Sequence, residues 1–163
     1  MAKIITSTVQ VHVVSYKPKT DEPRFLVLQR SEKSKIYPLM WQVVTGKIKG
    51  KESAVETALR EFKEETSAKP MKMWAIPYLT EFYDHRRDII QISPVFGILI
   101  NFKEKIKLSQ EHVDYDWLSL KECIKRLPLP THKEGTQKFW DNILSKKDKN
   151  MFLVNILKKI KSS

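Results

Sequence analysis

Hydrophobic and polar positions alternate along several stretches of the chain, which predicts β-strands. Within 4–16, the β-branched residues Val9, Val11 and Val13 recur at every second position, as on one buried face of a strand. Five stretches of this kind are predicted as strands: 4–16, 25–30, 41–45, 73–82 and 89–102. The last two flank a polar turn and predict a hairpin, in which Pro94 marks a sheet edge or a bulge.

A helical period replaces the alternation after Ser53. Ser53 and Glu56 have the spacing of a capping box, which predicts a helix start at this point. Apolar residues then recur at helical spacing and predict a face that packs on a sheet: Ala54, Val55, Ala58, Leu59 and Phe62. Further helices are predicted at 120–126, after Ser119 as N-cap, at 135–144, after a rigid proline-rich break at 127–130, and at 151–160.

Three glutamates stand close together on the first of these helices. Glu61, Glu64 and Glu65 are spaced i, i+3 and i+4, so their carboxylates crowd one patch of the helix and repel one another. A hard divalent cation relieves such repulsion, and Mg²⁺ commonly joins a few protein carboxylates to substrate phosphates. The alternative is that the patch is only a solvated acidic face.

Fixed residues around this patch extend it to a longer pattern: Gly46, five residues, Glu52, seven residues, Arg60-Glu61, Phe62, one residue and Glu64-Glu65. The pattern resembles the Nudix box, G-x5-E-x7-R-E-U-x-E-E-x-G-U with U a bulky apolar residue. This box is the signature of hydrolases that act on nucleoside diphosphates linked to another group. The resemblance implies an α/β fold, a Nudix-type α/β/α sandwich around a mixed β-sheet, and Mg²⁺-dependent hydrolysis of a phosphoanhydride.

The resemblance also implies roles for individual residues. The carboxylates of Glu61, Glu64 and Glu65 would be metal ligands, and Arg60 and Glu52 would orient them. The Gly46 carbonyl would be a further ligand.

Two positions depart from the family pattern. Ser67 stands where the family has Gly, and Ala68 is small for the final apolar position. Because Gly normally allows a left-handed helix end, the departure at Ser67 concerns the exit from the helix and no ligand.

Glu111 is a further candidate, far from the box in sequence. It directly precedes the alternating residues Val113, Tyr115 and Trp117, which predict a final strand. Many Nudix enzymes bring an additional acidic residue to the metal from a comparable E-H-x-x-Y-x-W segment. The resemblance therefore implies that Glu111 is a metal ligand or the general base, and an exposed loop carboxylate is the alternative. The expected catalytic residues are Arg60, Glu61, Glu64 and Glu111, and the expected metal ligands are Gly46, Glu61, Glu64, Glu65 and Glu111.

His112 follows Glu111 and has no second His or Cys at metal-ligand spacing, so a structural role is expected. The loop before Trp41 is expected to overhang the metal site. Lys33 and Lys35 would then meet phosphates, and Tyr37 or Trp41 would stack on a base. Solvated lysines and a core position for Trp41 are the ordinary alternatives.

The segments around Trp41 to Gly46 and Glu111 to Trp117 look most like one Nudix subgroup. That subgroup hydrolyses deoxynucleoside triphosphates such as dATP, or dihydroneopterin triphosphate, and releases pyrophosphate. Dinucleoside polyphosphates, ADP-ribose and triphosphorylated RNA 5′ ends stay open as substrates, and Tyr83 favours the first of these. A non-catalytic ligand-sensing or nucleic-acid-binding module is a further alternative, which the intact Arg60 and glutamates disfavour.

Length, net charge and apolar content limit the classes of partner and the cellular compartment that we expect for this protein. A chain of 163 residues fits one domain, 1–163. The net charge of +11 suits an anionic partner, but it is spread along the chain without a nucleic-acid-binding motif, so nucleic acid is not favoured over a small triphosphate. No apolar run has the length of a membrane span, and Cys123 is predicted to be a small buried or half-buried side chain. We expect a cytoplasmic protein, monomer or homodimer, that uses Mg²⁺, with Mn²⁺ as a substitute.

Overall fold

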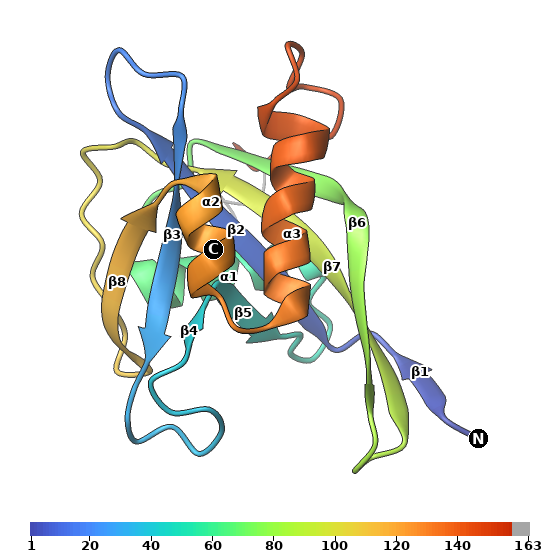
Figure 1. Cartoon of the computed structure of the whole chain (residues 1–163). Helices are drawn as coiled ribbons and strands as arrows, with labels where there is room; N and C mark the ends of the chain where they lie inside the picture. The colour runs from blue at the N-terminus through green and yellow to red at the C-terminus, as the bar shows by residue number, and fades with distance from the viewer. Residues whose placement is uncertain (158–163) are drawn as a thin grey trace.

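The structure, a computed structural model, describes residues 1–157 and forms an eight-stranded mixed sheet between helices (Figure 1). The strands are β1 (Lys3–Ile5), β2 (Thr8–Tyr16), β3 (Pro23–Arg30), β4 (Trp41–Gln42), β5 (Val44–Lys47), β6 (Lys72–Asp84), β7 (Ile89–Leu99) and β8 (His112–Leu118). The helices are α1 (Ala54–Thr66), α2 (Leu120–Arg126) and α3 (Pro130–Phe139), which continues into one π-helical turn, η1 (Trp140–Leu144). The predicted α/β sandwich around a mixed sheet is confirmed.

β2 organises the sheet because it pairs with three other strands. It runs parallel to β7 and antiparallel to β3 and β5. β4 and β8 pair with β3, whereas β1 and β6 pair with β7. Gly46 of β5 lies opposite Val9, near the start of β2. Tyr16 is the last residue of β2 and therefore lies at the opposite end of this strand.

Two apolar cores fill the spaces on the two faces of the sheet. Strand residues alternate between them, since successive side chains of a strand point to opposite faces. On the α1 side, Val11 and Val13 pack with Ala58 and Phe62. On the α2 and α3 side the core contains Val14, Phe25, Val27, Cys123 and Phe139. The prediction that Cys123 is buried is therefore confirmed.

The predicted hairpin is confirmed as β6 and β7, and Pro94 marks a bulge. Pro94 lies opposite Leu79, where the pairing of β6 shifts register between Ala75 and Leu79. β7 as a whole is not an edge strand, because it pairs with β6 on one side and with β1 and β2 on the other. Pro94 falls between the part of β7 that pairs with β1 and the part that pairs with β2, so its missing N–H is not needed there.

Several predicted boundaries are corrected by the structure. The stretch 4–16 is divided into β1 and β2, and 41–45 into β4 and the start of β5. The helix predicted at 135–144 begins five residues earlier, at Pro130. Proline is well suited to the first helical turn, where its missing N–H has no partner to lose, so the proline-rich segment starts this helix instead of delaying it.

The helix predicted at 151–160 is not formed over 151–156. This segment instead lies along the edge of β6: Val154 N–H donates to the Met73 carbonyl at 2.8 Å, and Ala75 N–H donates to the Phe152 carbonyl at 3.0 Å. Pairing with an open strand edge satisfies the backbone of both segments, which outweighs a weak helical period. Residues 158–160 lie outside the described residues. No helix within residues 1–157 has the length and apolar character needed to cross a membrane.

Candidate active site

Local contacts hold α1 at both ends. At its start, Glu56 N–H donates to the Ser53 hydroxyl at 3.2 Å and Ser53 N–H donates to the Glu56 carboxylate at 2.8 Å, which confirms the capping box. At its end, Ser67 adopts the left-handed conformation, with φ 56° and ψ 10°. The helix thus ends with the geometry that the family's glycine would provide, although a serine occupies the position.

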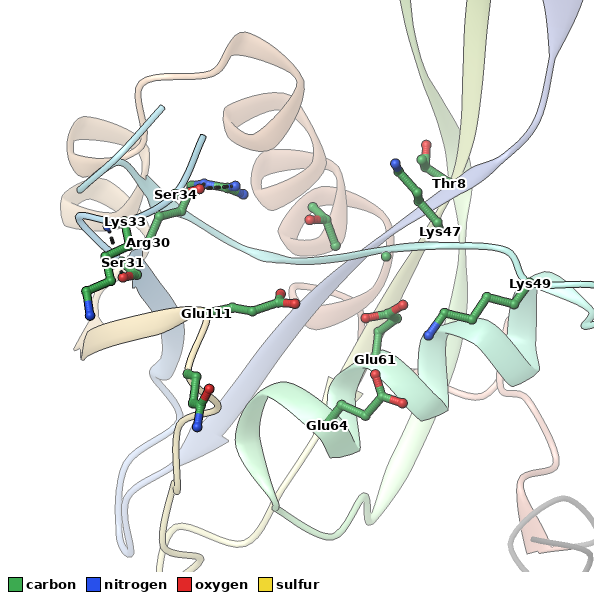
Figure 2. A pocket seen from close by; sticks show the side chains of 13 residues that line it. Thr8, Arg30, Ser31, Lys33, Ser34, Lys47, Lys49, Glu61, Glu64 and Glu111 are labelled. Atoms are coloured by element: carbon green, nitrogen blue, oxygen red, sulfur yellow. Dashed lines mark hydrogen bonds between the residues drawn. The ribbon is translucent and has the colours of Figure 1, made fainter. Parts of the chain in front are cut away.

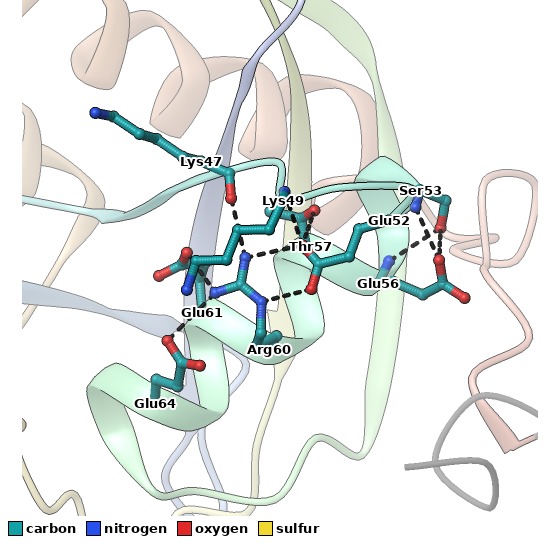
Figure 3. Close-up of polar contacts among 9 residues, drawn as sticks. All are labelled: Lys47, Lys49, Glu52, Ser53, Glu56, Thr57, Arg60, Glu61 and Glu64. Carbon is teal, nitrogen blue, oxygen red and sulfur yellow. Dashed lines mark hydrogen bonds and ion pairs between the residues drawn. The ribbon is translucent and has the colours of Figure 1, made fainter.

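Arg60 links three acidic side chains of the box, Glu52, Glu61 and Glu64, into one network (Figure 3). Its guanidinium donates to the Glu52 carboxylate at 2.7 and 2.9 Å, to Glu61 at 2.6 Å and to Glu64 at 3.3 Å. A further hydrogen bond of 2.9 Å reaches the Lys47 carbonyl, and so ties the helix to the loop. The hydrogen bonds from Arg60 lower the pKa of Glu52 to about 2. Arg60 therefore fixes the orientation of Glu61 and Glu64 through one oxygen of each.

Gly46 leaves the space that Glu61 fills. A β-carbon at position 46 would overlap the Cγ atom and the carboxylate of Glu61. The Glu61 side chain is only 12% exposed. A glycine is therefore required here by the close approach of a carboxylate to the backbone.

Glu65 is buried beside His112, with one carboxylate oxygen unsatisfied. No hydrogen-bond partner for Oε2 exists among the described residues, and the nearest His112 nitrogen, Nε2, is 3.9 Å away. Burial raises the pKa of Glu65 well above its usual range, and the charges of Glu61 and Glu111 raise it further. Burial and the Arg30 charge lower the pKa of His112 to about 4, so the imidazole is neutral at pH 7 and makes no ion pair with Glu65.

His112 belongs to a chain of polar contacts behind the carboxylates. The Gln42 side-chain amide contacts His112 Nε2 at 2.9 Å, and Arg30 donates to the Gln42 oxygen at 3.2 Å. All three side chains come from different strands, β3, β4 and β8. His112 thus anchors the start of β8, where Glu111 is the preceding residue.

Glu111 lies across the same cavity as Glu61 and Glu64 (Figure 2). The cavity has a volume of about 670 Å³. The Glu111 carbonyl accepts a hydrogen bond of 2.8 Å from Ser31 N–H, which joins the loop before β8 to the end of β3. The fold thereby brings Glu111, which is about fifty residues beyond the box in sequence, to the cavity beside α1.

Basic side chains line this cavity together with the carboxylates. Lys33 is among them, as expected from its loop, whereas Lys35 does not line the cavity within the described part of the chain. Sequence reasoning missed Lys47, the last residue of β5, and Lys49, which stands on the loop between β5 and α1. Their position among the five variable residues after Gly46 could have indicated that they line the cavity, because that segment must pass beside the Glu61 carboxylate.

The two aromatic candidates lie apart from the cavity lining. Tyr37 is 57% exposed. Trp41 is half-buried, packs against the core beside α2, and carries the Arg126 guanidinium 4.8 Å from its ring centre. Trp41 is thus engaged by the protein itself, in agreement with its core alternative.

The donor set around the cavity suits a hard divalent cation. The carboxylates of Glu61, Glu64 and Glu111 face it, and the unsatisfied oxygen of buried Glu65 is a donor in need of a partner. Among residues 1–157, no three acidic, histidine or cysteine side chains are gathered at coordinating distance as they stand. Binding an ion therefore requires the free oxygens of Glu61 and Glu64, which Arg60 leaves unused, to turn toward it.

Comparison with known proteins agrees with this geometry. The family profile of the NUDIX domain matches residues 6–140. Dihydroneopterin triphosphate diphosphatase from Haemophilus influenzae is 28% identical over 144 residues, which cover 82% of this chain and 87% of that protein. A Myxococcus xanthus protein named octanoyltransferase is 25% identical over 138 residues, and the match covers 80% of this chain but only 36% of that longer protein.

Among solved structures, the MutT protein from Methanosarcina mazei superimposes with a TM-score of 0.68 at 27% identity, covering 86% of this chain and 96% of that one. The α/β sandwich, the capped box helix and the acidic cavity at its side are those of a Nudix hydrolase. The chain belongs to the Nudix family.

Proposed function

We propose that this protein is a Mg²⁺-dependent hydrolase of a (deoxy)nucleoside triphosphate, or of a related triphosphate such as dihydroneopterin triphosphate, and that it releases pyrophosphate. One observation carries the proposal: Glu61, Glu64 and Glu111 share a single cavity with Lys33, Lys47 and Lys49. Carboxylates suit the metal, and ammonium groups suit the phosphates that the metal bridges. A cavity of about 670 Å³ accommodates a nucleotide-sized ligand.

The metal would be held by the carboxylates of Glu61, Glu64, Glu65 and Glu111 and by the Gly46 carbonyl, and Mn²⁺ would substitute for Mg²⁺. When bound, the ion supplies charge neutralisation on the phosphates and a lowered pKa for the attacking water. Because Oε2 of the buried Glu65 has no hydrogen-bond partner within residues 1–157, a bound ion would supply the missing contact.

The protein's own residues would position the reaction. Arg60 keeps one oxygen of Glu61 and one of Glu64 engaged, which leaves the other oxygen of each free to turn toward an ion. Lys47 and Lys49 would hold phosphate oxygens against the carboxylates, with Lys33 on the opposite wall. Glu111 is exposed, stands apart from the Arg60 network, and would accept the proton of the attacking water or bind a further ion.

The subgroup assignment rests on the similarity to the Haemophilus influenzae diphosphatase. At 28% identity the substrate is a proposal, and dinucleoside polyphosphates, ADP-ribose and triphosphorylated RNA 5′ ends are the competing substrates to test.

The test is a panel of these compounds with Mg²⁺, in which the products of each are separated by chromatography. We expect pyrophosphate from a triphosphate substrate, and we expect Glu64→Gln to lower the rate about 10²–10³-fold. Orthophosphate release, or faster cleavage of ADP-ribose or a dinucleoside polyphosphate, would overturn the substrate assignment. Absence of Mg²⁺-dependent turnover over the whole panel would favour a non-catalytic module.

A further inference from the structure

A second hollow lies at the other end of the sheet from the candidate active site. Its volume is about 330 Å³, and it opens between the end of β2, the start of β6 and the turn η1. Tyr16 and Val9 are seven residues apart on β2, and Gly46 pairs with Val9, so the two sites are separated by about 23 Å of strand. A ligand in this hollow would not touch the box carboxylates.

The wall of the hollow combines aromatic rings with ammonium groups. Tyr16 and Trp140 stand among apolar side chains, while Lys72 and Lys149 outnumber one acidic group, Asp21. Aromatic faces take planar rings, and the excess of positive charge selects an anion. The volume lies at the lower end of the range for small-molecule sites, which suits a ligand the size of a mononucleotide.

The π-helical turn gives this wall its shape. Ser145 N–H donates to the Trp140 carbonyl at 2.9 Å, five residues back, where an α-helix would use the residue four back. The wider turn keeps Trp140, Leu144 and Ser145 together on the hollow. π-helical turns inside helices recur at functional sites, because they are kept at a cost in helix geometry.

Two polar groups at this wall are placed for a ligand. The Tyr16 hydroxyl is half-buried and has no hydrogen-bond partner within residues 1–157. Burial raises the pKa of Tyr16, and the Asp21 charge raises it further, so the hydroxyl is a neutral hydrogen-bond donor. Lys149 is held in place because its ammonium donates to the Lys146 carbonyl at 2.7 Å, which leaves further N–H groups for an anion.

We propose that this hollow binds a planar aromatic anion of the nucleotide class, with its ring between Tyr16 and Trp140 and its anionic group at Lys72 and Lys149. The site is separate from the proposed hydrolysis and does not depend on it. Such a second site would let a nucleotide be sensed without being hydrolysed.

The test uses AMP as the probe, protein labelled with ¹⁵N at tryptophan, and no divalent ion. The indole signal of Trp140, assigned with Trp140→Phe, is expected to shift and saturate, while that of Trp41 at the opposite end of the sheet stays in place. Lys72→Glu is expected to weaken AMP binding about tenfold or more, since it removes a charge-assisted contact and repels the phosphate. Adenosine, which has no phosphate, is expected to bind more weakly than AMP.

The matched control is Lys121→Glu, because Lys121 is also exposed, lies on α2 outside the hollow, and its substitution makes the same change in net charge. It should leave AMP binding unchanged. A Trp140 indole signal that does not move on adding AMP would overturn the proposal. Equal affinities of wild type and Lys72→Glu would also overturn the proposal.

Discussion

The side chain of Glu61 lies directly against the α-carbon of Gly46, so that a β-carbon at position 46 would overlap its Cγ atom and carboxylate. Glu61 cannot retreat easily, because Arg60 holds its carboxylate at 2.6 Å. The backbone of β5 and the first glutamate of the box are therefore matched in shape, and each limits what the other position tolerates.

We predict that Gly46→Ala lowers kcat about 10²-fold by displacing Glu61 from the cavity. Steady-state kinetics at saturating Mg²⁺ measures this loss. Gly50→Ala is the matched control: open space surrounds Gly50, but its φ of 54° makes alanine strained. It should cost about 1 kcal/mol of stability and leave kcat unchanged. A Gly46→Ala variant with wild-type kcat would show that the position of Glu61 does not matter.

Mg²⁺ is expected to stabilise the protein through Glu65. A ligand that binds only the folded state raises the free energy of unfolding, and with it the melting temperature. The gain is about 2.7 kcal/mol when the ligand concentration is 100 times its dissociation constant. Glu65→Gln keeps the buried shape but cannot ionise to bind the ion, so the rise in Tm on adding Mg²⁺ should shrink strongly. Thermal unfolding across a Mg²⁺ titration measures it, with the exposed Glu81→Gln as control. An undiminished Mg²⁺ effect would remove Glu65 from the metal ligands.

Glu111→Gln should lower kcat substantially with little change in Tm, because the residue is exposed at the cavity and outside both cores. A rate that recovers with added Mg²⁺ or Mn²⁺ identifies metal binding, and a rate that does not recover identifies proton transfer. If kcat and its dependence on metal are both unchanged, Glu111 is only a loop carboxylate and a box glutamate takes the proton.

Ser67→Gly should stabilise the protein by up to about 1 kcal/mol, because Ser67 is left-handed and glycine adopts that conformation without a β-carbon penalty. The loss of the exposed 3.3 Å hydrogen bond from its hydroxyl to the Lys107 carbonyl offsets part of the gain. Ser145→Gly is the control: it loses a similar exposed bond, at 3.2 Å, from a right-handed position with φ −77°. Denaturant unfolding should therefore show opposite signs for the two variants.

Three buried histidines, His12, His112 and His132, predict a loss of stability in acid, because burial lowers the pKa of each. Burial lowers the pKa of His12 to about 3 and that of His132 to about 4, from 6.5. Below pH 6.5 the unfolded chain binds protons that the fold excludes, so the free energy of unfolding falls as the pH drops toward 4. Each unit of pKa shift corresponds to about 1.4 kcal/mol.

Thermal unfolding between pH 7.5 and 4.5 measures this slope. His132→Gln, which cannot ionise, should make the slope shallower by the His132 share while His12 and His112 keep theirs, whereas the exposed His85→Gln should leave the slope unchanged. The same slope in His132→Gln and wild type would assign the acid sensitivity to other groups.

The sequence by itself determined the features that neighbouring residues encode. The capping box at Ser53, the apolar face ending at Phe62 and the hairpin around residues 83–88 depend on side chains within a few positions of one another, so their spacing specifies them. The family was visible for the same reason, because its pattern is contained within one loop and one helix.

Tertiary structure decided the features that depend on distant segments meeting. The pairing of β8 with β3 brings Glu111 to the cavity, and the packing of α1 on the sheet buries Glu65. Residues 151–154, which were predicted to be helical, instead pair with the edge of β6. The meeting of Lys33 with Lys47 and Lys49 across one cavity is of the same kind. Such contacts follow from the free energy of the whole packed chain, in which burial and backbone pairing outweigh local preference, and so no single stretch of sequence encodes them.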